Sequence, residues 1–490
     1  MENSKVSKLY TLFNPKSIAF IGASNNPKKW GFIVLGNLIN GGFNGPIFPI
    51  NPKESSVQGL KAYISIAELP EAPDLAVIVV PPLTIPPIID ECVAKGIRAG
   101  LVITAGFAEV GVKGERLQKE IVERARKGKM VLVGPNCNGI MRPSWKLYSV
   151  MPPIFPPAGP IAVVSQSGNV ATSITRLLMK KGFGCSYFVS SGNEADLHTE
   201  DYFEYMAEDN ETKVILSYIE GFKDGRRFFE IAKRVTKKKP IIVLKAGETI
   251  AGAKAAKSHT ASLAGDNSIF NTACNQAGVI RANNMNELVN IGISLISQPL
   301  PRGKQVGIIT AGGGWGVLAA DACVKAGLEV VTLPDETLAE LNTFLPPWWS
   351  RSNPVDLVAG LSASDMRKSL ESLLKCPKLD GVILLGIVAA MPFKPIRPSA
   401  SQYAIKHRTK EMLLMISDIY DQFMRMANIY QKPVIIGSEF PFILGDLEIQ
   451  MAYMLGEKGY VCYTEPGDVA LVMASLVNYA QYLRSRAQLS

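Results

Sequence analysis

The first strand expected in this chain lies in the stretch KSIAFIGAS, residues 16–24. Its four apolar residues, 18–21, have the length of a buried strand, and a glycine, an alanine and a serine follow them directly. The same order recurs in PIAVVSQSG at residues 160–168 and in QVGIITAGGG at residues 305–314. A strand that runs through a small-residue turn into a helix is how an open parallel sheet begins. The sequence therefore predicts three α/β domains of similar construction.

Further apolar runs of strand length follow each of these three starts. They cover residues 75–80, 100–104 and 130–133, then 185–189, 214–219 and 240–244, and finally 381–385 and 433–436. Because these runs are apolar throughout, they suit parallel sheets with helices on both faces. The proline-rich segments 152–157 and 297–304 are expected to be linkers. Residues 391–430 are expected to form a mainly helical insertion, whose methionine and aromatic stripe belongs to the core or to a subunit contact.

The composition excludes several classes of protein. Of 490 residues, 47% are apolar and 19% charged, which is ordinary for a folded α/β protein. The most apolar stretch, residues 75–89, is interrupted by prolines, so we expect no membrane span. The first residues lack the apolar core of a secretory signal, and the seven scattered cysteines form no CxxC pair. These features predict a cytoplasmic protein with reduced thiols and no structural metal site.

The charge indicates what kind of partner to expect. A net charge of +9 favours anionic partners. The lysines are dispersed, and no basic stripe is interleaved with aromatic residues, so nucleic acid is not expected. A phosphorylated small molecule or an acidic partner subunit fits better. No Walker pattern occurs, so the glycine turns are not expected to hold a nucleoside triphosphate.

Three loops in the first third form a candidate ligand edge. The turn at Gly22 and Ser24 could hold a pyrophosphate on its backbone N–H groups. It lacks the full GxGxxG spacing, so a plain tight turn explains it equally well. Pro81 stiffens the loop after the run 75–80, and Thr104 leads into a small turn after the next run. All of these positions would share one sheet edge, where a nucleotide-like ligand could lie flat.

Two further helix starts, Ser167–Gly168 and Gly313–Gly314, are candidate phosphate sites. Aimed at one point, they would hold a free dianion, because each helix start presents unpaired donors and a partial positive charge. Ordinary β–α turns explain both segments equally well.

His259 is the histidine best suited to chemistry. It lies in a small-residue stretch, residues 251–265, shortly after a strand, and a neutral imidazole can attack an activated phosphoryl group. Glu220, just past a strand end, could orient it. The alternative is an alanine-rich helix start capped by Ser258. His407 and His198 are not expected to take part, the latter because it lies among acidic residues expected to be exposed.

These residues, taken with several short motifs, resemble the α subunits of nucleoside-diphosphate-forming acyl-CoA synthetases. That family includes the ADP-forming acetate–CoA ligases and is related to succinyl-CoA synthetase. The resemblance runs from Leu12 to Tyr479. Its motifs are LFNPKSIAFIGAS (12–24), PINPK (49–53), GPNC (134–137), SQSG (165–168), GNEAD (192–196), YIEG (218–221), KDGRR (223–227), SHT (258–260) and NPVDL (353–357).

The resemblance implies a fold and a reaction. The fold is a Rossmann-like CoA-binding domain (1–145) followed by two flavodoxin-like ligase domains (158–298 and 303–490). The reaction interconverts acyl-CoA, phosphate and ADP with acid, CoA and ATP. Phosphate attacks the thioester to give an acyl phosphate, and a loop histidine then carries the phosphoryl group to a nucleotide site.

The same resemblance implies roles for individual residues. His259 would be phosphorylated and Glu220 would support it. Phosphate would be held by Ser167 and Gly168 at one helix start and by Gly313 and Gly314 at another. Asn136 would lie near the thioester. The CoA cleft would be lined by Gly22, Ser24, Lys53, Pro81 and Thr104.

Three departures from the family pattern bear on turnover. Ala261 replaces the glycine that usually follows Ser-His-Thr, and Glu248 stands where an arginine is common. The third glycine turn has Thr310 and Ala311 in place of an asparagine-containing sequence. These changes bear on phosphate affinity and rate more than on the type of reaction.

The resemblance also implies a partner. Fused relatives carry an ATP-grasp module of roughly 200 residues, more than a typical domain, and the three predicted domains leave no room for one. ADP or ATP and Mg²⁺ are therefore expected on a separate ATP-grasp β subunit, in an α₂β₂-type assembly. The chain alone would catalyse the acyl-CoA half-reaction.

Two rival functions stay open at this point. One is a regulatory protein that binds CoA or acyl-CoA without turnover, for which Ala261 and Glu248 are the support. The other is a Rossmann-type dehydrogenase. It is disfavoured because residues 51–53 read Asn-Pro-Lys, which suits a phosphate, where a ribose-binding acid would be needed.

Overall fold

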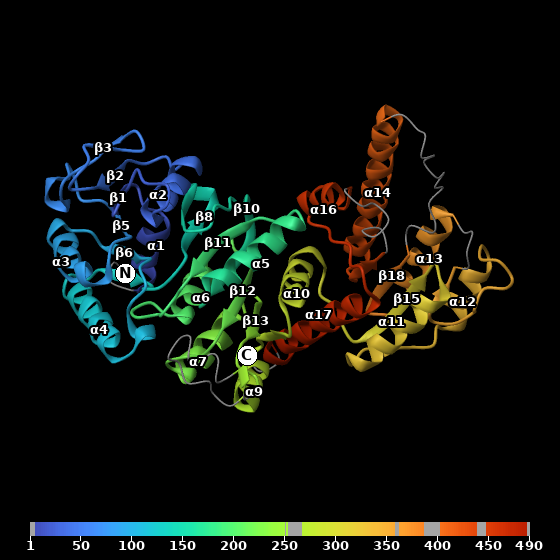
Figure 1. Cartoon of the computed structure of the whole chain (residues 1–490). Helices are drawn as coiled ribbons and strands as arrows, with labels where there is room; N and C mark the ends of the chain where they lie inside the picture. The colour runs from blue at the N-terminus through green and yellow to red at the C-terminus, as the bar shows by residue number, and fades with distance from the viewer. Residues whose placement is uncertain are drawn as a thin grey trace. The chain divides into compact units, whose positions relative to one another are not determined.

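The computed structural model describes residues 5–249, 251–252, 267–357, 362–386, 402–438 and 447–487. It contains three mainly parallel sheets covered by helices, so the predicted α/β class is confirmed (Figure 1). The chain divides into two compact units. Unit 1 comprises residues 1–178 with 184–288 and contains the first two sheets; unit 2 comprises residues 179–183 with 289–490 and contains the third.

The first sheet is parallel throughout, with strand order β2-β1-β5-β6-β7. Its strands are β1 (Ile18–Ile21), β2 (Ile47–Ile50), β5 (Leu75–Ile78), β6 (Ala99–Val102) and β7 (Val131–Val133). The accompanying helices are α1 (Lys5–Phe13), α2 (Trp30–Asn40), α3 (Ile85–Lys95) and α4 (Val112–Lys127), and a short hairpin joins β3 (Ser56–Val57) to β4 (Leu60–Lys61). Every residue of β1, β5 and β6 is buried, as expected for strands covered on both faces.

The second sheet has the order β14-β13-β12-β10-β11-β8-β9. Its parallel strands are β10 (Ala158–Ser165), β11 (Cys185–Ser190), β12 (Val214–Ile219), β13 (Ile241–Lys245) and β14 (Ile280–Ala282). Its helices are α5 (Gly168–Lys180), α6 (Thr199–Glu208), α7 (Gly225–Val235) and α9 (Asn267–Ala277). The next helix, α10 (Met285–Ser297), begins in unit 1 and lies mostly in unit 2.

An antiparallel hairpin that the sequence did not predict extends this second sheet. It consists of β8 (Gly139–Arg142) and β9 (Leu147–Val150), and β8 pairs with β11. The hairpin spans residue 145, the predicted end of the first domain, and its strand pairing joins it to the second sheet. Gly139 has a φ of +106°, and a Cβ there would lie 2.0 Å from the Ser149 carbonyl oxygen, so only glycine fits.

Within unit 1, the N-terminal helix α1 packs against elements of the second sheet. The Phe13 ring lies 4.8 Å from the Tyr187 ring and 5.4 Å from the Tyr205 ring, centroid to centroid. One continuous core contains apolar residues from both sheets, including Phe20, Leu101 and Val164. The two sheets of unit 1 therefore share a core instead of being joined only by a linker.

Unit 2 is built on a five-stranded parallel sheet, with order β16-β15-β18-β19 and β17 paired with β15. Its strands are β15 (Gln305–Thr310), β16 (Glu329–Val330), β17 (Val355–Asp356), β18 (Gly381–Leu385) and β19 (Val434–Gly437). Its helices are α11 (Gly313–Lys325), α12 (Asp335–Asn342), α13 (Ala363–Lys375), α14 (Gln402–Tyr430), α16 (Leu447–Glu457) and α17 (Pro466–Ala487).

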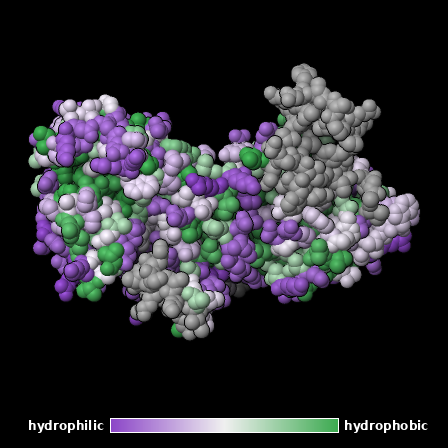
Figure 2. All heavy atoms as spheres, viewed as in Figure 1, coloured by the Kyte–Doolittle hydropathy of each residue, from purple (hydrophilic) through white to green (hydrophobic). Residues whose placement is uncertain are grey.

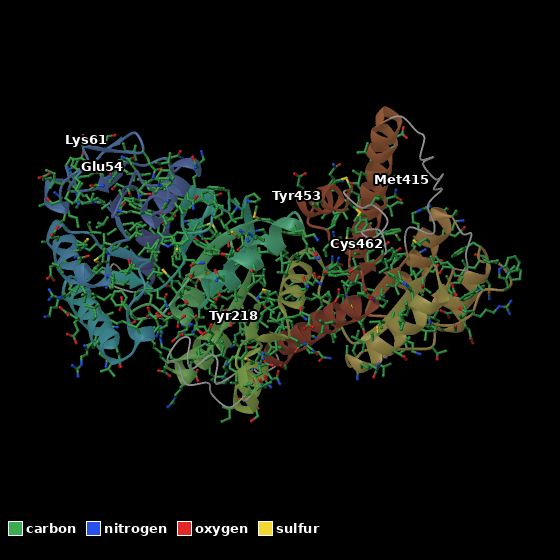
Figure 3. The ribbon with its side chains drawn as sticks, in the orientation of Figure 1. Glu54, Lys61, Tyr218, Met415, Tyr453 and Cys462 are labelled. Carbon is green, nitrogen blue, oxygen red and sulfur yellow. The ribbon has the colours of Figure 1, made fainter. Side chains whose placement is uncertain are left out.

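The long helix α14 lies in the predicted helical insertion; residues 391–401 of that prediction lie outside the described residues. Its apolar stripe, which includes Ile416, Tyr420 and Phe423, is buried in the core of unit 2, whereas Met415 on the same helix is partly exposed (Figure 3). The stripe is therefore core. None of the described helices combines the length and apolar character that crossing a bilayer requires.

The surface of unit 1 mixes polar and apolar residues in the view of Figure 2. Large apolar side chains are exposed at Trp30, the first residue of α2, and at Leu83 and Val110, which lie in short helical turns after β5 and β6. Exposed apolar residues scattered in this way are normal for a soluble domain.

Replacing Asn353 with alanine should lower the free energy of unfolding of unit 2 by about 2 kcal/mol, measured by chemical denaturation. The Asn353 side chain hydrogen-bonds to backbone groups of β15 and of the residue that follows β16, as a neighbouring strand would. Its Oδ1 accepts the Ile308 N–H at 2.9 Å, and its Nδ2 donates to the carbonyls of Val306 and Val331, both at 2.9 Å. The matched control, S352A, removes an exposed hydroxyl and should change the stability by less than about 0.5 kcal/mol. Equal stability of the two variants would contradict this account.

Candidate functional site

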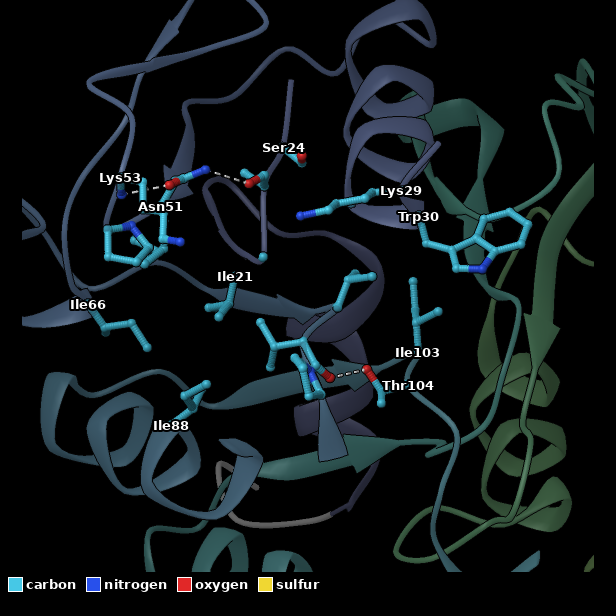
Figure 4. Close-up of a pocket in the computed structure, with 18 of the residues that line it drawn as sticks. Ile21, Ser24, Lys29, Trp30, Asn51, Lys53, Ile66, Ile88, Ile103 and Thr104 are labelled. Carbon is cyan, nitrogen blue, oxygen red and sulfur yellow. Dashed lines mark hydrogen bonds between the residues drawn. The ribbon is translucent and has the colours of Figure 1, made fainter. Parts of the chain in front are cut away.

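A cleft of about 1080 Å³ opens at the carboxyl edge of the first sheet (Figure 4). The five positions that the sequence analysis assigned to the CoA cleft line it, namely Gly22, Ser24, Lys53, Pro81 and Thr104, and so does Asn136, which was expected near the thioester. The other lining residues are Ile21, Ala23, Lys28, Lys29, Trp30, Gly31, Ile50, Asn51, Pro52, Glu54, Ile64, Ser65, Ile66, Val79, Val80, Ile88, Glu91, Ile103, Ala105, Cys137, Asn138 and Met151. The volume lies just above the usual range of about 300–1,000 Å³ for small-molecule sites.

Two glycines shape the floor of this cleft. Gly22 has a φ of +93°, and a Cβ there would lie 2.3 Å from the Val79 carbonyl oxygen. Gly31, in the first turn of α2, packs so closely that a Cβ would lie 1.9 Å from the Gly22 carbonyl oxygen. The β1–α2 turn therefore brings bare backbone to the cleft without the GxGxxG spacing, because the second close contact comes from within the helix.

Positive charge surrounds this turn. Lys28 and Lys29 immediately precede α2, whose N-terminus lacks a side-chain cap, and Lys53 faces the cleft from the loop after β2. Asn51 joins the two loops: its Nδ2 donates to the Ala23 carbonyl at 3.0 Å, and its Oδ1 accepts the Lys53 N–H at 2.8 Å (Figure 4). Lysines and an uncapped helix start suit the phosphates of a nucleotide-like ligand.

The far end of the cleft is made by Thr104 and the segment 136–138. The Thr104 hydroxyl donates to the Val80 carbonyl at 2.7 Å, and the Thr104 carbonyl accepts the Asn136 N–H at 2.9 Å. Asn136 has a φ of +58° and donates through Nδ2 to Asn193 Oδ1 at 3.1 Å. Asn193 lies in the loop that follows β11 of the second sheet. This end of the cleft is therefore fixed to the second domain.

Helix α5 begins beside the same end. A Cβ on Gly168 would lie 2.2 Å from Asn138 Cγ, so the helix start packs directly against a residue that lines the cleft. The Ser165 hydroxyl accepts the Ser167 N–H at 3.1 Å and donates to the Ser167 carbonyl at 2.7 Å, which fixes the turn. The N–H groups of the first helical turn have no partners within the helix and suit an anion.

Gln166 connects this turn to Glu220. Its Oε1 accepts the backbone N–H of Glu220 at 2.6 Å and that of Gly221 at 3.2 Å, and its Nε2 donates to the Gly221 carbonyl at 2.7 Å. Nε2 also donates to Glu194 Oε2 at 3.1 Å. Sequence reasoning gave Gln166 no role, because nothing in the SQSG motif indicates that its side chain reaches a neighbouring strand end.

Glu220 is buried at the end of β12 in a polar environment. Burial, and to a smaller extent the Glu220 carboxylate, raises the pKa of Tyr218 to about 12; Tyr218 is labelled in Figure 3. The buried Lys245 ammonium donates to the Glu220 carbonyl at 2.9 Å, and burial lowers the pKa of this lysine. Because its pKa is raised, the Tyr218 phenol stays protonated at neutral pH.

The expectation that the acidic residues around His198 are exposed is wrong. Glu194, Glu200 and Asp201 are buried, and His198 is half-buried at the start of α6. Arg227 pairs with Glu200 Oε1 at 3.0 Å and with Asp201. Carboxylates can be buried when a guanidinium pairs with them, and the sequence alone does not show which arginine lies beside them.

Burial also affects Glu194, one of these acidic residues. It raises the pKa of the Glu194 carboxyl despite hydrogen bonds from the Thr199 and Ser191 hydroxyls at 2.6 and 2.7 Å.

The remaining predicted residues are not among those that line the cleft. Gly313 and Gly314 are exposed at the start of α11 in unit 2, and a Cβ at Gly314 would meet nothing within 4 Å. His259 and Ala261 lie outside the described residues. Glu248, which removes a positive charge common in the family, pairs with Arg281. Within the described ranges, no three histidine, cysteine or carboxylate side chains gather closely enough to hold a metal ion.

Three family models match the chain in the predicted order. They are a CoA binding domain over residues 16–143, a succinyl-CoA ligase like flavodoxin domain over 158–294 and a Ligase-CoA domain over 306–400. Together with the sheets described above, they confirm the predicted fold class.

Known proteins resemble the chain over nearly its whole length. The α subunit of ADP-forming acetate–CoA ligase II from Pyrococcus furiosus is 40% identical over 96% of this chain and 97% of its own. The ADP-forming acetate–CoA ligase of Methanocaldococcus jannaschii is 43% identical over 70% of this chain but only 48% of its own. The structure of acetyl-coenzyme A synthetase 1 from Ca. Korarchaeum cryptofilum, in complex with phosphate and ADP, is 32% identical with a TM-score of 0.84, covering 98% of both chains.

The variant G31A should weaken CoA binding at least about tenfold in calorimetric titrations, because the new Cβ pushes α2 away from the Gly22 carbonyl at a cost of about 1–3 kcal/mol. G36A is the matched control. It lies in the same helix, and its Cβ would meet only the Oε1 atom of the Gln58 side chain, at 3.3 Å, with no backbone atom from outside that helix within 4 Å. Undiminished CoA affinity in G31A, or an equal loss in G36A, would contradict the geometry described.

Cys137 should resist iodoacetamide in the folded protein at pH 8 and react after denaturation. It lines the cleft but is buried, its Sγ donates to the Val102 carbonyl at 3.4 Å, and burial raises its pKa to about 12. The reactive thiolate is therefore scarce at pH 8. Peptide mass spectrometry should detect modification first at Cys462, the one half-buried cysteine among seven free thiols. Rapid native modification of Cys137 would contradict this.

Proposed function

Because this chain belongs to the family of ADP-forming acetate–CoA ligase α subunits, we propose that it catalyses the acyl-CoA half of an ADP-forming acyl-CoA synthetase reaction. In the complete reaction, acyl-CoA, phosphate and ADP interconvert with carboxylic acid, CoA and ATP. The step assigned to this chain forms an acyl phosphate, and the phosphoryl group then passes to His259.

One observation carries the proposal: the cleft ends at the segment 136–138, which packs against the start of α5. CoA bound with its phosphates near Lys53 and the β1–α2 turn would direct its thioester toward Asn136. Phosphate on the first turn of α5, at Ser167 and Gly168, would then lie beside the thioester. The cleft, the proposed anion site at the start of α5 and the carboxylate of Glu220, which Gln166 connects to that helix start, would then follow one another in unit 1.

The chemistry follows from this order. A phosphate oxygen attacks the thioester carbonyl carbon, the C–S bond breaks, and CoA leaves as a thiolate that takes up a proton. The His259 imidazole then attacks the phosphorus, and the carboxylate of the acid leaves with the electrons of the P–O bond. Glu220 would hold the other imidazole nitrogen and stabilise the charged product. Gly313 and Gly314 would supply the second helix start for phosphate.

A partner subunit is part of the proposal. Relatives named as α subunits match this chain along nearly their whole length, whereas relatives named as ligases without a subunit designation are about twice as long as the matched region. We assign the ADP or ATP site and Mg²⁺ to an ATP-grasp β subunit, in an α₂β₂-type assembly. This chain's own residues would then serve CoA, phosphate and the phosphohistidine.

The rival function, a CoA-binding regulatory protein without turnover, is not favoured. Proteins named as ligases match this chain from end to end. Glu248, one of the two residues that supported the rival, is paired with Arg281, so the substitution does not leave an unpaired negative charge there. The seven free thiols also suit the reducing cytoplasm in which we propose that the protein works.

The purified chain should acquire an acid-labile phosphoryl group when incubated with ³²P-phosphate and a suitable acyl-CoA. Acetyl-, 4-hydroxybutyryl- and feruloyl-CoA form the panel, because relatives are named for all three acids. H259A should abolish the label and E220Q should slow it about a hundredfold, as expected for loss of a supporting charge at a nucleophile. H407A is the matched control and should label normally.

Absence of label with every acyl-CoA, both alone and with a co-expressed β subunit, would reject the proposed function. CoA binding that persisted under those conditions would favour the regulatory alternative.

A further inference from the structure

The side chain of Asn193 lies where the two sheets of unit 1 meet, and all of its polar atoms are engaged. Its Nδ2 donates to Glu109 Oε2 at 2.5 Å and to Gln118 Oε1 at 3.0 Å. Its Oδ1 accepts from Asn136 Nδ2 at 3.1 Å. On the backbone, the Asn193 N–H donates to the Pro135 carbonyl at 2.9 Å. The side-chain amide therefore has a fully specified set of partners.

Glu109 determines which way this amide faces. One of its oxygens accepts the N–H groups of Gly106 and Phe107, at 2.6 and 3.1 Å, and the other accepts from Asn193. Burial favours the protonated form of Glu109, but the hydrogen bonds from Asn193, Gly106 and Phe107 outweigh it and hold the pKa below its ordinary value. An ionised carboxylate can only accept, so Asn193 must turn its NH₂ toward Glu109 and its oxygen toward Asn136.

The consequence reaches the cleft. Because Asn193 directs its side-chain oxygen toward Asn136, Asn136 must donate to it through its NH₂ group. This bond fixes the Asn136 amide in one of its two possible orientations. Asn136 lines the end of the cleft, and Thr104 and Ala105, in the loop that Glu109 closes, line it too. Glu109 is thus connected to the Asn136 amide, the group expected to face the thioester, through one intervening side chain, that of Asn193.

We propose that Glu109 and Asn193 are positioning residues, which orient the Asn136 amide toward the acyl-CoA thioester. This inference rests on the proposed function, and it adds two residues to which the motifs gave no role. Neither side chain touches the reacting atoms. Their effect is on the rate of acyl transfer, because a misdirected amide at the thioester removes a positioned hydrogen-bonding group from the transition state.

A polarity swap tests the relay. In E109Q the new amide keeps its oxygen for Gly106 and Phe107 and offers an NH₂ to Asn193. Asn193 must then flip, which in turn flips Asn136 and requires Gln118, now facing an oxygen, to turn its own NH₂ toward Asn193. In the double variant E109Q/N193D an acceptor-only carboxylate lies between the introduced amide at position 109 and Asn136, with the Gln118 amide turned to donate to it, and Asn136 regains its native orientation. The readouts are the initial rate of acid-labile ³²P labelling with the best acyl-CoA of the panel, the Kd for CoA and the melting temperature.

We expect E109Q to label at least about tenfold more slowly than wild type while its Kd for CoA changes less than about threefold. We expect E109Q/N193D to recover most of the rate. The matched control is R126Q, which breaks the bond of 2.9 Å between Arg126 Nε and Asp196 Oδ1, another contact between α4 and the segment after β11. It should label as wild type does, because it leaves the relay intact.

Three results would overturn the inference while leaving the proposed function intact: wild-type labelling in E109Q, no recovery in the double variant, or equal slowing in R126Q. The last two would indicate a merely structural role. A wild-type chain that binds CoA yet takes no label under any condition would instead reject the proposed function, and the inference with it.

Discussion

The side-chain amide of Gln166 is the interaction on which the candidate site most depends. It accepts the N–H groups of Glu220 and Gly221 and donates to the Gly221 carbonyl and to Glu194. Two strand ends and the start of α5 are therefore held in one register by a single group. Because these bonds are partly buried, losing the amide would leave several backbone groups without their partners, which is costlier than losing one surface contact.

A second constraint is the close contact between Gly31 and the Gly22 carbonyl, which lets α2 begin against the β1 turn. It brings backbone donors and three lysines to one end of the cleft, while Asn136 and Asn138 form the other. The hydrogen bonds of Asn193 and the contact of Gly168 with Asn138 attach that second end to the neighbouring sheet. Unit 1 thus joins the lysine-lined end of the cleft, through Asn136 and Asn138, to the start of α5.

Much of this was predictable from sequence, because it depends on local signals. The small-residue turns at Gly22 and Gly168 mark strand-to-helix transitions, and the apolar runs gave most strands to within one or two residues. What sequence could not provide depends on tertiary pairing. The hairpin β8–β9 lacks a distinctive pattern and is defined by its partner β11. The buried carboxylates of Glu200 and Asp201 depend on Arg227. Gln166, Asn193 and Glu109 gain their roles from partners far away in the chain. His259 was identified by its motif, and its place in the site remains a prediction.

The most direct test of the central claim is a crystal structure of the chain with CoA. The account predicts the adenosine phosphates near Lys29 and Lys53 and the thiol sulfur, located by anomalous scattering, beside Asn136 and Asn138 at the start of α5. A sulfur found at the lysine end, with the phosphates near Asn136, would contradict the account, because phosphate on α5 could not then reach the thioester.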